Sequence, residues 1–171
     1  MNTGAKVRAG TAMLTSLASA ICLQGVGAPA MAGSRVVHVS GTSTATVDFD
    51  SAQLVSRGQQ CLLLADLRGN LTGDLVGETV GSEQILFFVT CEELLAGEEL
   101  RSDNYRAVGN FVGTDGEFAG KETTFTDVGR FDKGTYTGNS LVQGDMSGVL
   151  HVSGSLSTGI VTYDGNLVVN G

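Results

Sequence analysis

The chain has 171 residues, of which 18 are Asp or Glu and 10 are Lys or Arg, so its formal net charge at pH 7 is −8. This acidic balance argues against nucleic acid and anionic membrane surfaces as partners, because both repel negative charge. The length suits one domain with a buried core. The sequence contains no phosphate loop, dinucleotide fingerprint or CxxC motif, so no cofactor is predicted.

Residues 1–32 have the order of a secretory signal peptide. Lys6 and Arg8 precede a weakly apolar stretch, and Ala30 and Ala32 occupy the −3 and −1 positions of an A-x-A cleavage site. A short membrane anchor or a core helix is the alternative. The stretch is too short and too rich in Gly, Ser and Thr to span a bilayer, however. We therefore predict cleavage after Ala32, secretion, and no membrane insertion after cleavage.

The mature part, residues 33–171, retains two cysteines, Cys61 and Cys91. A small, even number of cysteines in an exported protein most often forms a disulfide, and two buried thiols are the alternative. Closing a loop of this length would stabilise the fold by about 3–4 kcal/mol. No third thiol or suitably spaced histidine accompanies the pair, so no metal site is predicted.

Short apolar or alternating runs recur along the mature part, each bounded by Gly, Asn or Asp turn signals. Many short strands with a turn about every eight to twelve residues are typical of an antiparallel barrel or sandwich. Glycine permits the tight turns and marks the bulges and bends that a small closed barrel needs. We predict a single all-β domain, a closed antiparallel barrel of about eight strands. The runs interpreted as strands are Val36–Ser40, Thr44–Phe49, Gln60–Leu67, Leu71–Val76, Gln84–Cys91, Tyr105–Val112, Glu117–Thr126, Arg130–Thr137, Gly148–Ser153 and Gly159–Val169.

One segment departs from the strand pattern. Cys91–Asp103 contains good helix formers and doubled carboxylates, which indicates a helical turn or an acidic loop. As the longest interruption of the sheet it is a candidate barrel lid or interaction loop, with a solvated connector as the alternative.

Catalytic motifs are sparse. The chain has two histidines, His38 and His151, and no G-x-S-x-G elbow. A histidine within a strand is more often a wall residue than a base. Asp48 and Asp50 are spaced to share a strand face, as a glycosidase pair would, but the chain has no Trp for a sugar platform, and a solvated rim is the alternative.

The large aromatic residues either fill the barrel or form a ligand cage. Tyr105, His151 and Tyr163 are the candidate ligand-binding residues, and the catalytic residues cannot be assigned from the sequence. The aromatic residues considered are Phe87, Phe88, Phe111, Phe118, Phe125, Phe131, Tyr105, Tyr136 and Tyr163.

The part of the chain from Val108 onward resembles the bacterial allene oxide cyclase barrel-like family. The segments "GNFVGTDGEFAGKETTF" and "GTYTGNSLVQGDMSGVLHVSGSLSTGIVTYDGNLVV" carry the resemblance, with "QGDMSGVLHVSG" where that family has "GTGDLAGLRGxG". The resemblance implies a lipocalin-sized antiparallel barrel. In the plant cyclases an acidic residue and an ordered water inside the barrel act on an epoxide; here no motif fixes such a carboxylate, and Asp48 and Asp50 are the candidates.

Three classes of function remain open. The first is a secreted, non-catalytic barrel that binds a small apolar ligand or a protein partner. The second is a barrel cyclase or isomerase with a small apolar substrate, and the third is a structural or surface domain with a filled barrel. An open lumen with an inward carboxylate or with His151 would favour the enzyme, and an open apolar lumen the binder. An oligomer formed through an exposed Val/Leu strand face also stays open.

Overall fold

The computed structural model describes residues 33–97, 103–132, 134–155 and 157–170. The predicted signal peptide, residues 1–32, therefore lies outside the described residues, as does part of the acidic segment. Among the described residues, no helix combines the length and the apolar character needed to cross a membrane.

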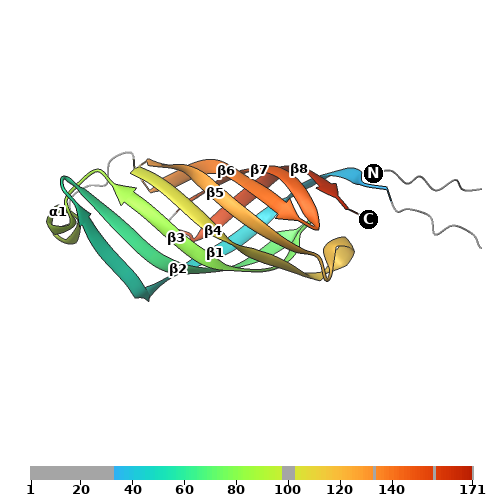
Figure 1. Ribbon diagram of the computed structural model, residues 1–171, viewed down its shortest axis with the longest axis horizontal. Coiled ribbons are helices and arrows are strands. Elements are labelled where there is room, and N and C mark those ends of the chain that lie inside the picture. Colours follow the sequence, from blue (N-terminus) through green and yellow to red (C-terminus); the bar gives the residue numbers. More distant parts are fainter. Residues whose placement is uncertain (1–32, 98–102, 133, 156, 171) are drawn as a thin grey trace, which may run out of the picture. The chain divides into compact units, whose positions relative to one another are not determined.

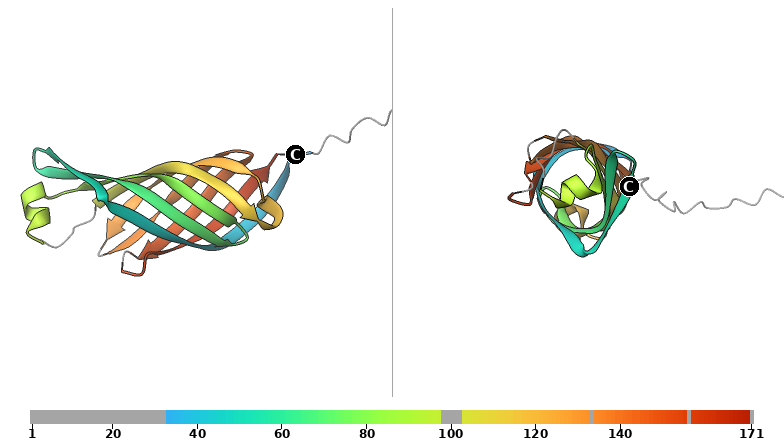
Figure 2. Two further views of the ribbon diagram at one scale, coloured as in Figure 1. Left: turned by 90° about the horizontal axis from the view of Figure 1, so that it is seen from below. Right: turned by 90° about the vertical axis from the view of Figure 1, so that its left-hand side faces the viewer.

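Eight antiparallel strands form a closed barrel, as the sequence predicts (Figures 1 and 2). Each strand pairs with the next one along the chain, and β8 closes the barrel on β1, from the pair Arg35–Val169 to the pair Thr44–Ile160. A two-residue turn at Gly58 joins β1 to β2, where φ is +67°, a conformation that glycine adopts at no steric cost. The strands are β1 (Arg35–Arg57), β2 (Gln60–Gly73), β3 (Val76–Phe87), β4 (Asp103–Asp115), β5 (Glu122–Asp132), β6 (Thr135–Gly144), β7 (Met146–Ser155) and β8 (Ile160–Val169).

Several strand boundaries differ from those expected. The two predicted strands at the mature N-terminus are one continuous strand, β1, because Gly41 lies within it rather than in a turn. The predicted strand Leu71–Val76 spans the β2–β3 turn. Leu75 lies in that turn and is only 3% exposed, since the turn folds into the barrel end. An apolar turn of this kind cannot be told from a strand by hydropathy alone.

A large bulge interrupts β1. Asp48 pairs with Asp66 of β2 but Gln53 pairs with Leu64, so four residues of β1 stand opposite Ala65 alone. The Ser51 hydroxyl donates to the Asp48 carbonyl at 2.7 Å and accepts from the Asp66 amide at 2.9 Å. This side chain thus replaces part of the interrupted ladder. Bulges often lie near functional sites, where they redirect a strand.

The interior is filled from alternate positions of all eight strands, as the period of two requires. The larger of two buried clusters is apolar and occupies the end of the barrel near the chain termini; it includes Val39, Leu75, Phe118, Met146 and Leu167. The short 3₁₀ helix η1 (Gly116–Phe118) carries Phe118 into this end. The smaller cluster contains Cys61 and Phe87 near the opposite end.

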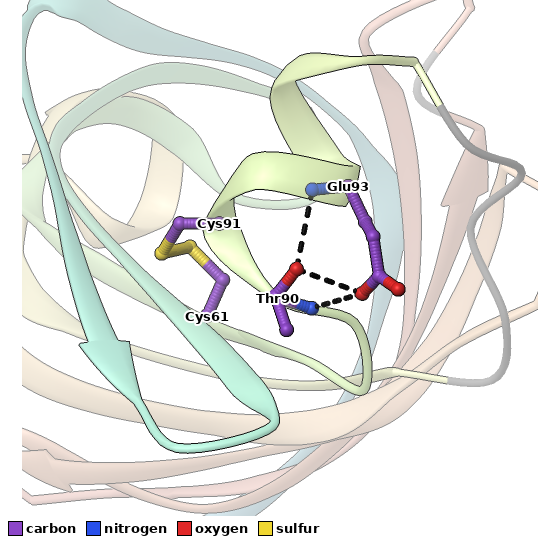
Figure 3. Close-up of a disulfide and its surroundings, with 4 residues drawn as sticks. All are labelled: Cys61, Thr90, Cys91 and Glu93. Carbon is purple, nitrogen blue, oxygen red and sulfur yellow. Dashed lines mark hydrogen bonds between the residues drawn. A yellow bond between two sulfur atoms is a disulfide. The ribbon is translucent and has the colours of Figure 1, made fainter.

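A short helix, α1 (Cys91–Leu95), lies at that opposite end (Figures 1 and 2). The Thr90 hydroxyl accepts from the Glu93 amide at 3.2 Å, and the Glu93 carboxylate accepts from the Thr90 amide at 2.7 Å, which is a capping box (Figure 3). The predicted disulfide is confirmed: Cys91 is bonded to Cys61 of β2. Leu94 and Cys91 pack on the smaller buried cluster, so the disulfide and α1 cover one side of this end.

Removing the disulfide should destabilise the barrel. In the variant Cys61→Ala/Cys91→Ala, the unfolded chain regains the freedom of the loop between two residues 30 positions apart. The free energy of unfolding should fall by about 3–4 kcal/mol, measured by urea denaturation. An unfolding curve identical to that of the unmodified protein would contradict this role. Ser56→Ala, beside Cys61 on the exposed part of β1, serves as the control and should change stability little.

Candidate functional site

Two carboxylates face the inside of the barrel. Across the strands, Glu83 of β3 pairs with Ala107 of β4, Ala107 pairs with Asp127 of β5, and Asp127 pairs with Ser140 of β6. Directly paired residues point to the same face of a sheet, so all four side chains enter the lumen at one level. Ala107 has the smallest side chain of the four. It stands between the two carboxylates and leaves the space between them open.

The lumen contains two adjoining cavities. The outer cavity has a volume of about 280 Å³ and the inner cavity about 110 Å³. Ala45, Leu67, Asp127 and Val161 line both, so Asp127 lies where they meet. The inner cavity is otherwise largely apolar. The outer cavity is lined by Ala45, Thr46, Val47, Phe49, Leu67, Glu83, Tyr105, Ala107, Asp127, Phe131, Tyr136, Ser155, Gly159 and Val161.

The outer cavity has its mouth at the end of the barrel that carries the β7–β8 turn. Its lining includes Ser155 and Gly159 at that turn, and Phe49 from the β1 bulge, which is 74% exposed. β1 pairs with β8 as far as Thr44 and continues as a longer hairpin with β2 (Figure 1). β1 therefore runs on past the end of β8, and its residues Val47 and Phe49 line the outer cavity there.

Two buried polar atoms, on residues that line the outer cavity, have no hydrogen-bond partner among the described residues. They are Oδ1 of Asp127 and the hydroxyl oxygen of Tyr105. The Ser140 hydroxyl hydrogen-bonds the Asp127 carboxylate, which leaves Oδ1 unsatisfied. Since buried polar groups in proteins are almost always paired, these two atoms indicate a missing partner such as a ligand or water.

Burial changes the protonation of both carboxylates. Desolvation, and secondarily the charge of Asp127, raises the pKa of Glu83 to about 7. Desolvation also raises the pKa of Asp127 to about 6, although the hydrogen bond from Ser140 lowers it. Near neutral pH, Glu83 thus exists in both protonation states, which is what a group that gives and takes protons requires.

Three aromatic rings lie beside the carboxylates. The centroids of Tyr105, Phe131 and Tyr136 are 5.2–5.7 Å apart in tilted and edge-to-face arrangements. Burial raises the pKa of both tyrosines, and the charges of Asp127 and Glu83 raise it further. The two hydroxyls therefore stay protonated at physiological pH.

The structure does not bring the three candidate ligand-binding residues together. Tyr105 lines the outer cavity. Tyr163 lines the inner one, but its hydroxyl accepts from the Leu75 amide at 2.9 Å and donates to the Thr72 carbonyl at 3.0 Å, so it anchors the β2–β3 turn. His151 is exposed on the outer face, 2.7 Å from the Asn139 side chain, and lies outside the lumen.

The two inward carboxylates are the residues that sequence reasoning missed. Asp48 and Asp50, the carboxylates considered instead, are exposed at the β1 bulge. In the sequence, Glu83 is two and four positions from Ile85 and Phe87, so it shares their inward face of the strand. Asp127 shares the inward face of Phe125 and Phe131 in the same way. An acidic residue on the apolar face of a strand was the available signal. Within the described ranges, no three His, Cys, Asp or Glu side chains gather as metal ligands.

The chain has a structural likeness among solved proteins. No protein-family model matches the chain. No curated protein matches it either. Among solved structures, the chain is similar to the pterocarpan synthase dirigent protein GePTS1, with 17% sequence identity and a TM-score of 0.44. The alignment covers 88% of this chain and 99% of that one.

The two half-buried lumen carboxylates, Glu83 and Asp127, should make stability fall as pH rises. The folded state holds its protons more tightly than the unfolded chain, where the pKa of Glu is near 4.5. The stabilisation is therefore complete below about pH 4 and is lost as pH rises through 6 and 7. Glu83→Gln should raise the free energy of unfolding at pH 8 by about 2 kcal/mol, and by much less at pH 4, in urea denaturation.

Glu78→Gln is the matched control, since Glu78 is exposed on the outer face of the same strand. It should leave the pH dependence as in the unmodified protein. Parallel pH profiles for Glu83→Gln and the unmodified protein would contradict the buried position of Glu83.

Proposed function

We propose that this protein binds a small, predominantly apolar molecule inside the barrel. The observation that carries the proposal is a cavity whose lining residues include Asp127 and Tyr105, each with one buried polar atom that has no partner among the described residues. Apolar walls with a few convergent polar groups are the usual composition of a small-molecule site. The apolar walls would supply affinity, and the polar groups would orient the ligand.

We also infer that the protein acts outside the cytoplasm. The Cys61–Cys91 disulfide is compatible with an oxidising compartment. The N-terminal segment with its A-x-A site ending at Ala32 supports export, with a mature chain beginning at Gly33.

Filling the lumen should abolish ligand binding. In Ala45→Phe, the added ring would occupy the junction of the two cavities, because Ala45 lines both. The probe is N-phenyl-1-naphthylamine, which is uncharged at neutral pH and fluoresces more strongly in apolar surroundings. The unmodified protein should give a saturable, one-to-one increase in fluorescence, and Ala45→Phe should reduce the affinity at least tenfold.

Thr44→Phe is the matched control, since this substitution adds the same ring to the outer face of the same strand. It should bind the probe as the unmodified protein does. A fluorescence increase that does not saturate, or one that Ala45→Phe retains, would place the apolar site elsewhere and contradict the proposal.

Proton-transfer catalysis is a second candidate function. The pKa values of about 7 for Glu83 and about 6 for Asp127 favour it, because a neutral carboxylic acid and a carboxylate then coexist at one cavity. The neutral carboxylic acid can protonate a bound oxygen, while the carboxylate accepts a proton or stabilises positive charge. This pair suits an isomerase or cyclase that acts on a small apolar substrate.

An acid-sensitive epoxide tests this second function. Protonation of the oxygen of styrene oxide opens its ring, and a hydride shift with return of the proton gives phenylacetaldehyde, so no water or other reactant is consumed. Gas chromatography should show this isomerisation with the unmodified protein and with Glu78→Gln. Glu83→Gln and Asp127→Asn should each lose at least 90% of the rate. Equal rates in all four proteins would exclude a role for the pair.

A further inference from the structure

The lining of the lumen is acidic without a basic counterpart. Glu83 and Asp127 line the outer cavity, and none of the described residues that line either cavity is Lys, Arg or His. The arginines of the surrounding strands, Arg68, Arg106 and Arg130, are all exposed at outward positions. A buried carboxylate is normally paired with a cation or fully hydrogen-bonded. Here that positive charge is missing from the barrel wall.

The two unpartnered atoms can also be paired by a positively charged hydrogen-bond donor. Asp127 Oδ1 accepts hydrogen bonds, and the Tyr105 oxygen can accept one as well as donate. An ammonium group carries three donors and no acceptor. It can therefore donate to the Asp127 carboxylate, whereas a ligand carboxylate has no donor to offer and leaves Asp127 unpaired.

The aromatic rings favour the same charge. Tyr105, Phe131 and Tyr136 line the outer cavity next to the carboxylates. The faces of aromatic rings attract cations, and sites that recognise ammonium ligands combine such rings with acidic groups. A carboxylate or phosphate in this position would meet two like charges, those of Glu83 and Asp127.

We propose that the outer cavity binds an apolar amine in its ammonium form, held between Glu83, Asp127 and Tyr105. The apolar part of the ligand would extend into the inner cavity, whose walls include Leu71, Phe111 and Leu150. The inference rests on the proposed binding of a small molecule in the lumen and specifies the chemical class of that molecule.

Three probes of matched size and different charge test this class. They are 4-phenylbutylamine, 4-phenylbutan-1-ol and 4-phenylbutanoate, titrated by isothermal calorimetry at pH 7.5 into the purified protein. The amine should bind at least tenfold more tightly than the alcohol, and the carboxylate should give no measurable heat. Equal or tighter binding of the alcohol, or binding of the carboxylate, would overturn the proposal while leaving a lumen that binds small molecules. Binding of none of the three would count against both proposals.

Neutral variants show which residues give the preference. Asp127→Asn and Glu83→Gln keep the shape of each side chain and remove its charge, and both relieve a buried charge, so both variants are expected to fold. Each should reduce the amine-to-alcohol affinity ratio at least fivefold. Glu78→Gln, on the outer face of β3, should leave the ratio unchanged. A ratio that survives both lumen variants would show that the ammonium lies elsewhere and overturn the proposal.

Discussion

Inward-facing glycines make room for aromatic rings, and the closed barrel depends on this packing. The interior of an eight-stranded barrel is just wide enough for its side chains, so a large ring from one strand needs a missing side chain on another. A Cβ at Gly41 would collide with the Tyr163 ring. Gly129 and Gly138 pair directly across β5 and β6; Gly129 lies against the ring of Tyr105, and Gly138 lies against its hydroxyl. The glycines of the second half of the chain thus serve the interior as well as the turns.

Small inward-facing residues also leave the space for the cavity. In the row of paired residues that runs through Ala65, Glu83, Ala107 and Asp127, alanine alternates with a carboxylate. Larger apolar residues at the alanine positions would fill the lumen and stabilise the fold by burying more surface. The barrel instead keeps open space beside two carboxylates whose ionisation burial opposes. Ionisable groups whose position lowers the stability of the fold in this way are found most often at functional sites.

The sequence predicts the fold well because the fold depends on local signals. Alternation, turn residues and two cysteines are enough to indicate a small closed barrel and the Cys61–Cys91 bond. The ends of the strands are harder to predict from the sequence. Gly41 is typical of a turn but lies inside β1, and Leu75 is typical of a strand but lies in a turn. The site is harder still. Glu83 and Asp127 are far apart in sequence and become neighbours only through the pairing of β3, β4 and β5, which no single segment determines.

The two ends of the barrel differ, and this difference sets the direction in which a ligand would bind. One end is closed by apolar packing that includes Phe118 and Met146, while the mouth of the outer cavity lies at the other, near Phe49. The carboxylates stand between that mouth and the inner cavity, so the apolar part of the proposed ligand would pass them to reach the inner cavity. Its polar group would then lie at Asp127. Because the bulge of β1 lies opposite Ala65, the direct partner of Glu83, that carboxylate also stands next to the irregular part of the wall. A surface depression there is lined by Ser51, Asp66 and Glu83, so Glu83 borders this depression as well as the outer cavity.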